Sequence, residues 1–329
     1  MTLRQLLRKP FVSTPLARPV DLTGRHLIVT GCGLGSLGYE TALQLAGWGA
    51  TVIISTRSNT PAVIESLKGA LAGKNTAGLI DGHNLDLSDA TSVRQFSHWY
   101  LEHYGTRLDC LINNAGIHLD LMSKWKEPTL SPDGHEIQWR TNYLGTVQLT
   151  HELLPLLKQT GHDVGEARVV NVVSQLHSRG SNELLFDSNR HYESWQAYGL
   201  SKLALIHFTR ELDRRLGSSD NIKSFSLHPG GKSGTYTNVA DRGLEGHALL
   251  GFIRKLGAPL EKLFMASAQE GAQTQILCAT AAEAISGCYY VNCEPTEASA
   301  DSNNPEAAER LWLETGDWLA QTNQASLAR

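Results

Sequence analysis

The sequence has few of the features that mark membrane, metal or disulfide-rich proteins. None of its apolar runs approaches the ~20 residues that a membrane-spanning helix needs, and no secretory signal is visible. Its five cysteines form no Cys-x-x-Cys pair and its 13 histidines form no His-Glu-x-x-His motif, so we expect reduced thiols and no metal. Reduced thiols are typical of a cytoplasmic protein.

A strong excess of one charge is also absent. The net charge of -4 gives no reason to expect a nucleic-acid partner. The most basic stretch is an N-terminal arm, residues 1–21, in which acids are missing as far as Val20. We expect this arm to pack on the domain or to stay loose, and a weak contact with a membrane surface is the alternative.

Apolar runs alternate with amphipathic stretches from Gly24 onward. Seven runs predict strands, at residues 26–30, 51–55, 77–81, 108–113, 167–173, 222–228 and 288–292. The stretches that predict helices are residues 36–48, 62–71, 88–104, 134–158, 195–216, 269–280 and 305–319. This alternation predicts an α/β fold with one doubly wound (Rossmann) domain, residues 22–320, in which helices flank a seven-stranded parallel sheet. Residues 321–329 are expected to form a C-terminal tail.

Two features interrupt this pattern. Pro155 falls inside the predicted helix 134–158 and should kink or shorten it. The glycine-rich segment 231–267 lies before the last strand and contains an apolar patch. It is either a substrate lid at the carboxyl edge of the sheet or a surface helix pair.

A glycine-rich loop directly follows the first strand. Glycines let the backbone approach a pyrophosphate, and the helix after the loop directs its positive N-terminus at the same point. The expected cofactor-binding residues here are Gly31, Gly33, Gly35, Ser36, Leu37 and Gly38. Cys32 inside the loop is expected to be a buried small residue; a redox switch is the alternative.

The end of the second strand indicates which cofactor is preferred. No carboxylate occurs from Ala50 to Thr60, where an acid would hold a ribose 2′-hydroxyl. Arg57 with its flanking hydroxyl side chains suits a 2′-phosphate better. We therefore predict NADP(H) as the preferred cofactor, with NAD(H) left open.

The loops after the third and fourth strands carry further cofactor candidates. Asp86 and Leu87 offer a carboxylate and an apolar contact for an adenine. The small side chains and the amide of Asn114, Ala115 and Gly116 would keep the floor of the site tight. Either loop taken alone is also compatible with a simple turn held by an Asx hydrogen bond.

A tyrosine and a lysine lie four residues apart in the helical stretch 195–216. Tyr198 and Lys202 share one helix face, so their polar ends can reach the same site. An ammonium close to the phenol favours the phenolate and makes tyrosine a usable general acid or base. The pair alone is more typical of a half-buried tyrosine beside a solvated lysine.

Taken in order, these motifs resemble the short-chain dehydrogenase/reductase family, over about residues 22–320. The similarity is greatest to the retinol-dehydrogenase-like group. It rests on the glycine loop, Asn113-Asn-Ala-Gly116, Asn142 in Asn-Tyr-Leu-Gly145, a strand ending in Ser174, Tyr198-x-x-x-Lys202, His228-Pro-Gly230 and Glu270-Gly-Ala-Gln-Thr274. One departure is that two residues separate Gly35 from Gly38, where family members usually have one.

The resemblance implies an oxidoreductase that interconverts a carbonyl and an alcohol on an apolar small molecule, retinoid-, steroid- or aldehyde-like. Tyr198 would exchange the proton and Lys202 would lower its pKa and hold the nicotinamide ribose. Ser174 would stabilise the substrate oxygen, and Asn142 would hold a water that links Lys202 to solvent. Hydride transfer itself belongs to the cofactor.

The resemblance adds three cofactor contacts after the sixth strand, at Pro229, Gly230 and Thr235, the last to the nicotinamide amide. It leaves open a homodimer paired through the helices that carry Asn142 and Tyr198. The alternative function is a catalytically silent dinucleotide-binding sensor or scaffold with the same fold. The stretches expected to shape the substrate pocket, residues 118–132, 175–195 and 231–268, contain no motif that specifies a ligand.

Overall fold

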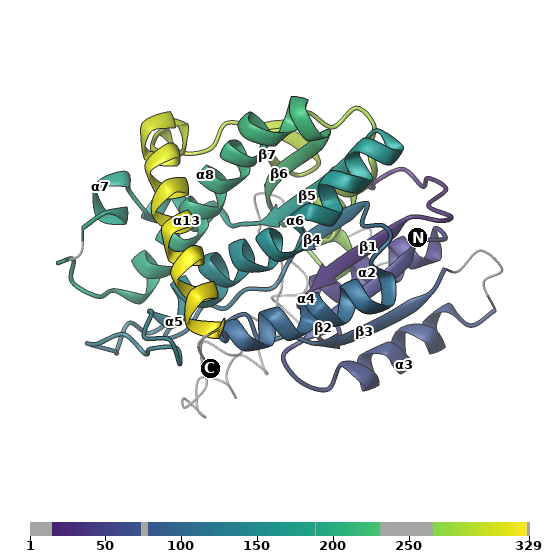
Figure 1. Cartoon of the computed structure of the whole chain (residues 1–329), viewed down its shortest axis with the longest axis horizontal. Helices are drawn as coiled ribbons and strands as arrows, with labels where there is room; N and C mark the ends of the chain where they lie inside the picture. Colours follow the sequence, from purple (N-terminus) through teal and green to yellow (C-terminus); the bar gives the residue numbers. More distant parts are fainter. Residues whose placement is uncertain (1–14, 74–77, 188, 231–265, 328–329) are drawn as a thin grey trace, which may run out of the picture.

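A single eight-stranded sheet organises the computed structural model, which describes residues 15–73, 78–187, 189–230 and 266–327 (Figure 1). The strands are β1 His26–Thr30, β2 Thr51–Thr56, β3 Ile80–Asn84, β4 Cys110–Asn113, β5 Ala167–Val172, β6 Ile222–His228, β7 Tyr289–Val291 and β8 Glu294–Thr296. Their order is β3-β2-β1-β4-β5-β6-β7-β8, and every pair is parallel except β7 with β8. The order reverses between β1 and β4, and open α/β sheets bind ligands at such a point.

Helices cover both faces of the sheet, which confirms the predicted doubly wound domain (Figure 1). One face carries α4 Ala90–Tyr104, α6 Gly145–Val164, α8 Ser194–Asp220 and α13 Pro305–Leu327. The other carries α2 Leu37–Gly47, α3 Thr60–Leu71 and α12 Gln273–Thr280. The shorter elements are α5 Ile137–Trp139, the π-helical η1 Arg140–Leu144, the 3-10 helices η2 Gln175–Arg179 and η3 Ala300–Asn303, α7 Asn182–Leu185 and α11 Ala268–Gly271.

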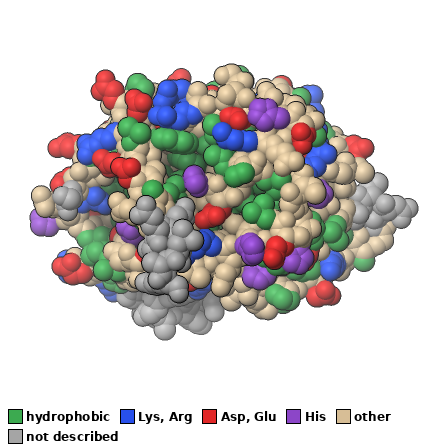
Figure 2. Space-filling view, viewed as in Figure 1, with side chains coloured by type: hydrophobic (Ala, Val, Ile, Leu, Met, Phe, Trp, Pro, Cys, Tyr) green, Lys and Arg blue, Asp and Glu red, His purple; other side chains and the backbone are tan. Residues whose placement is uncertain are grey.

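The surface carries charges of both signs. On the face shown in Figure 2, basic and acidic side chains are interspersed, and hydrophobic side chains lie between them. Within the four described ranges, no helix combines the length and the apolar character that a bilayer crossing requires.

The eighth strand is an addition to the seven that were predicted. After β7 the chain turns through Asn292 and Cys293, whose φ angles of 55° and 65° suit a tight hairpin. β8 then pairs antiparallel at the edge of the sheet, with Val291 opposite Glu294. Three exposed residues that include Pro295 give no apolar signal, and proline is tolerated at an edge where no partner needs its N–H.

Strand β3 begins at Ile80, later than predicted, and residue 77 at the predicted start lies outside the described residues. The apolar Leu79 and Ile80 suggested the wrong centre, because β3 is the other edge of the sheet and carries polar residues through Asn84. Its close approach to β2 explains Gly82, where a Cβ would lie 2.2 Å from the Ile54 carbonyl oxygen.

The predicted helix 134–158 is divided and longer than expected. It begins at Ile137, passes through the π-helical turn η1, and continues as α6 to Val164, so Pro155 does not shorten it. The last helix likewise continues to Leu327, past the predicted end at residue 319. The segment 231–265, which contains most of the predicted lid, lies outside the described residues.

Two helical glycines predict opposite effects of the same substitution. A Cβ at Gly316 of α13 would meet no atom within 4 Å, whereas one at Gly145 of α6 would lie 2.2 Å from the Leu87 carbonyl oxygen. Because alanine is the better helix former, we expect Gly316→Ala to raise the free energy of unfolding by about 1 kcal/mol. Gly145→Ala is the matched control and should lower it. Urea unfolding followed by circular dichroism measures both, and a destabilised Gly316→Ala protein would contradict this packing.

Candidate active site

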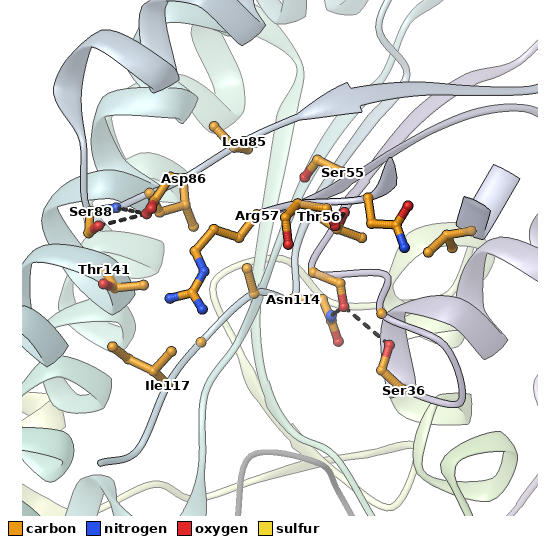
Figure 3. A pocket seen from close by; sticks show the side chains of 18 of the residues that line it. Ser36, Ser55, Thr56, Arg57, Leu85, Asp86, Ser88, Asn114, Ile117 and Thr141 are labelled. Atoms are coloured by element: carbon orange, nitrogen blue, oxygen red, sulfur yellow. Dashed lines mark hydrogen bonds between the residues drawn. The ribbon is translucent and has the colours of Figure 1, made fainter. Parts of the chain in front are cut away.

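A cavity of about 450 Å³ opens at the carboxyl ends of β1 to β4 (Figure 3). Its lining comes from the glycine loop and from the loops that follow β2, β3 and β4. The residues predicted to bind cofactor that line it are Gly31, Gly33, Ser36, Leu37, Arg57, Asp86, Leu87, Asn114, Ala115 and Gly116. The cavity therefore lies at the point of strand reversal where a dinucleotide is expected.

The glycines of the loop have two different roles. A Cβ at Gly31, whose φ is 74°, would lie 2.7 Å from the Ala115 Cα, and one at Gly38 would lie 2.6 Å from the Asn114 amide nitrogen. These two positions are closed by neighbouring protein. A Cβ at Gly33 or Gly35 would meet nothing within 4 Å, and of this pair Gly33 lines the cavity. The backbone around Gly33 is thus the part of the loop that is open to a ligand.

Two hydroxyl side chains fix this loop. The Thr30 hydroxyl accepts hydrogen bonds of 3.0 Å from the backbone N–H groups of Asn114 and Ala115. Ser36 caps α2 by accepting from the Tyr39 N–H, and its hydroxyl donates to the Gly31 carbonyl at 3.2 Å (Figure 3). The N-terminus of α2 is therefore held at the edge of the cavity, where its dipole favours an anion.

Arg57 is the basic residue of this cavity. It is exposed and projects from the end of β2 into the cavity (Figure 3). It makes no hydrogen bond or ion pair with any residue that the structure describes. The one acid in the lining, Asp86, accepts hydrogen bonds from the N–H and the hydroxyl of Ser88. The cavity thus holds one guanidinium and one anion-favouring helix end, at separate places in its lining.

The four candidate catalytic residues lie close to one another behind Gly116 of the cavity, and none of them belongs to the cavity lining itself. The Lys202 amine donates to the Val172 carbonyl at 3.0 Å, and the side chains of Tyr198 and Ser174 are hydrogen-bonded. A Cβ on Gly116 would lie 3.1 Å from the Lys202 Nζ and 3.3 Å from the Asn142 Oδ1. Glycine at 116 therefore lets both polar groups reach the floor of the cavity.

Asn142 lies in the π-helical turn and is fully buried. Its amide accepts from the Ile117 N–H at 2.8 Å and donates to the Ile117 carbonyl at 2.9 Å and to the Ser201 hydroxyl at 3.0 Å. Single π-helical turns are frequent at functional sites. Here the turn links the loop after β4 to α8, the helix that carries Tyr198 and Lys202.

Comparison with known proteins identifies this arrangement. The family model described as short chain dehydrogenase matches residues 25–242. This chain is a short-chain dehydrogenase. It is accordingly an NAD(P)-dependent oxidoreductase that acts on CH–OH groups of a small-molecule substrate.

Several relatives of this short-chain dehydrogenase share most of its length. Human retinol dehydrogenase 12 is 36% identical over 310 residues, which cover 93% of this chain and 90% of the relative. A probable oxidoreductase of Streptomyces antibioticus is 33% identical, with 89% and 97% covered. Among solved structures, an uncharacterized protein from Mycobacterium paratuberculosis is 29% identical with a TM-score of 0.66, covering 94% of this chain and 98% of that one. The chain therefore falls in the retinol-dehydrogenase-like group of the family.

Burial controls the ionisation of the candidate site of this dehydrogenase. It raises the pKa of Tyr198 to about 12, although the hydrogen bond with Ser174 acts in the opposite direction. Burial lowers the pKa of Lys202 to about 8. Lys202, whose amine binds the Val172 carbonyl, is not among the groups that shift the Tyr198 pKa in this structure. The phenol therefore keeps its proton at neutral pH.

Some predicted residues of the dehydrogenase lie outside the cavity lining. The described residues that do not line it are Gly35, Gly38, Pro229 and Gly230 and the four catalytic candidates Asn142, Ser174, Tyr198 and Lys202. Thr235 lies outside the described residues. Cys32 is fully buried and burial raises its thiol pKa, as expected of a packing residue.

Four further residues shape the site and were not predicted as site residues from the sequence. These are Thr30, Thr141, His118 and Arg140. For Thr30 a signal existed, because a buried threonine directly before the first glycine is placed to bond the neighbouring loop. His118 and Arg140 act through residues far away in the sequence, so no local pattern pointed to them.

Proposed function

We propose that this short-chain dehydrogenase prefers NADP(H) and interconverts a carbonyl and an alcohol on an apolar, retinoid-, steroid- or aldehyde-like molecule. The observation that carries the proposal is the hydrogen-bonded pair of Tyr198 and Ser174 beside the buried Lys202, whose amine lies next to Gly116 of the cavity lining. When bound, the nicotinamide supplies or accepts the hydride. The names of relatives such as retinol dehydrogenase 12 support an apolar substrate.

The protein's own part is to bind the substrate oxygen and to move a proton. In reduction the Tyr198 phenol, protonated at neutral pH, gives its proton to the oxygen. The Ser174 hydroxyl stabilises the charge that develops on that oxygen. Lys202 and Asn142 meet at Gly116, where they would hold the ribose and a proton path. Complete machinery of this kind gives no support to a catalytically silent sensor or scaffold.

A substrate panel tests the proposed reaction. NADPH oxidation is followed at 340 nm with retinaldehyde, a ketosteroid, aliphatic aldehydes and quinones, for the wild type and Tyr198→Phe. We expect turnover with at least one apolar carbonyl, and far less in the variant. Equal turnover by the two proteins would remove Tyr198 from the reaction.

The preference for NADP(H) rests on Arg57. Because its guanidinium lies in the cavity without a partner among the described residues, it is available to a 2′-phosphate. We expect Arg57→Ala to raise the KM for NADPH by about 10- to 100-fold, the loss of one charge-assisted contact, with little change for NADH. Steady-state kinetics with both cofactors measures this. The exposed Arg18→Ala is the matched control, and an equal effect on both cofactors would refute the assignment.

We also propose a cytoplasmic location for this protein. All five cysteines are free, which supports a cytoplasmic location that cell fractionation can test. Residues 1–14 of the basic arm lie outside the described residues, so its membrane-surface contact stays a prediction.

Pairing of two copies through α6 and α8 also stays a prediction. In the single chain α13 packs against α8, with Trp312 stacked on Phe208, so such a dimer would have to include α13. Analytical ultracentrifugation measures the oligomeric state.

A further inference from the structure

His118 lies against the candidate proton donor. Its ring stacks on that of Tyr198 with 4.3 Å between centroids and 13° between planes. Its other contact is edge-on to Trp195, at 4.5 Å and 88°. The side chain is 4% exposed, so the three rings form one packed group at the start of α8. We call His118, Trp195 and Tyr198 the aromatic group.

The backbone on both sides of His118 is fixed by hydrogen bonds. The preceding Ile117 is bound at both its N–H and its carbonyl by the amide of Asn142. The following Leu119 donates its N–H to the Gln138 side chain at 3.0 Å, and its carbonyl accepts from the Ser194 hydroxyl. His118 is therefore held by the π-helical turn and by the first residue of α8.

Trp195 is fixed in the same way. Its indole N–H donates to the Leu121 carbonyl at 3.1 Å, and the Arg179 guanidinium lies 5.1 Å from the centre of its ring. The imidazole therefore has a rigid indole on one side and the phenol of Tyr198 on the other. Parallel stacking restricts the rotation of the phenol ring about its own axis and its tilt.

The His118 ring supplies a flat surface and not a charge. Its Nε2 is buried and has no hydrogen-bond partner in the described part of the chain. Burial lowers the pKa of His118 to about 4, and the nearby Arg179 and Lys202 act in the same direction. Glu193 and Asp120 oppose this shift without reversing it. The imidazole is thus neutral where the enzyme would work.

We propose that His118 is a positioning residue that holds the phenol of Tyr198 in line for proton transfer through ring stacking. This inference rests on the proposed function, because it presupposes that Tyr198 transfers the proton. A misplaced proton donor lowers the rate of the chemical step and leaves binding largely intact. The expected defect of a His118 variant is therefore in kcat and not in KM.

Two substitutions separate stacking from the other properties of histidine. His118→Phe keeps a flat ring and removes the nitrogens, whereas His118→Leu keeps a similar volume and removes the ring. We expect His118→Leu to lower kcat by roughly 10- to 100-fold with KM within about threefold of wild type, and His118→Phe to keep most of the activity. His207→Ala, at a buried histidine further along α8, controls for general loosening of that helix.

A second readout does not depend on turnover. NADPH binding, followed by quenching of tryptophan fluorescence, and the melting temperature should change little in His118→Phe.

A double variant gives a third test. The substitution His118→Leu should have almost no further effect on the rate when it is made in Tyr198→Phe, because a residue that acts through the phenol loses its effect when the hydroxyl is gone. Single-turnover measurements at high enzyme concentration give these rates.

The activities of the two His118 variants decide whether stacking on Tyr198 is the role of this residue. Low activity in both His118→Leu and His118→Phe would overturn the stacking role and implicate the imidazole nitrogens. Wild-type activity in both, or an undiminished effect of His118→Leu in Tyr198→Phe, would also overturn it. If Tyr198→Phe itself turns over like the wild type, the proposed function fails, whatever the His118 variants show.

Discussion

Replacing Arg140 with methionine is expected to lower the free energy of unfolding by about 3–5 kcal/mol. The Arg140 side chain is fully buried and pairs with Asp133 at 2.7 Å. It also donates to the Leu87 carbonyl at 2.9 Å and to the Gln148 side chain at 3.0 Å. Its loss would leave one carboxylate without its partner and two buried oxygens without a donor, and each unpaired oxygen costs about 1–3 kcal/mol.

The consequences should reach the cofactor cavity. Arg140 begins the π-helical turn that carries Asn142, and Leu87 lines the cavity. Urea unfolding measures the stability, and titration with NADPH measures the coupled loss of binding. The matched control is Arg310→Met, since Arg310 forms an exposed pair with Glu314 and should contribute less than about 1 kcal/mol. Equal stability of the two variants would contradict the role assigned to Arg140.

Removing the Tyr198 hydroxyl is expected to lower kcat for carbonyl reduction by about 10²- to 10⁴-fold, the usual contribution of a positioned general acid. Tyr198→Phe retains the ring that stacks on His118 and loses the group that is hydrogen-bonded to Ser174. Its fold and its NADPH affinity should therefore stay close to those of the wild type. Stopped-flow single turnovers at 340 nm separate the chemical step from binding.

Tyr39→Phe is the control for this substitution. It also removes one phenol hydroxyl, which lies 2.9 Å from the Ser66 hydroxyl between α2 and α3, away from the candidate proton-transfer group. We expect its kcat to stay near that of the wild type. A comparable loss in Tyr39→Phe would mean that the Tyr198→Phe defect reports general disturbance and not proton transfer.

Local patterns in the sequence were sufficient for the fold and for much of the candidate site. Strand-helix alternation predicted the doubly wound sheet, because burial on both faces leaves continuous apolar runs. The glycine loop and Arg57 could be placed because each directly follows a buried strand whose carboxyl end faces the cavity. The spacing of Tyr198 and Lys202 sufficed because both lie on one helix, α8.

The features that were missed depend on contacts between distant segments. His118 follows a recognisable motif, but its stack on Tyr198 forms only when the loop after β4 meets α8. Arg140 reads as an ordinary polar helix residue until Leu87, Gln148 and Trp318 surround it. The raised pKa of Tyr198 was not expected either, since nothing in the sequence reports how strongly burial acts on this phenol.

The most direct test of Tyr198 as the proton carrier is the pH dependence of kcat/KM in both directions. Reduction needs the phenol and oxidation needs the phenolate, and burial raises the pKa of Tyr198 to about 12. From about pH 6 to 9, reduction should stay level while oxidation rises with pH, by up to about tenfold per unit. Reduction that increases with pH, or an oxidation profile that survives in Tyr198→Phe, would contradict the account.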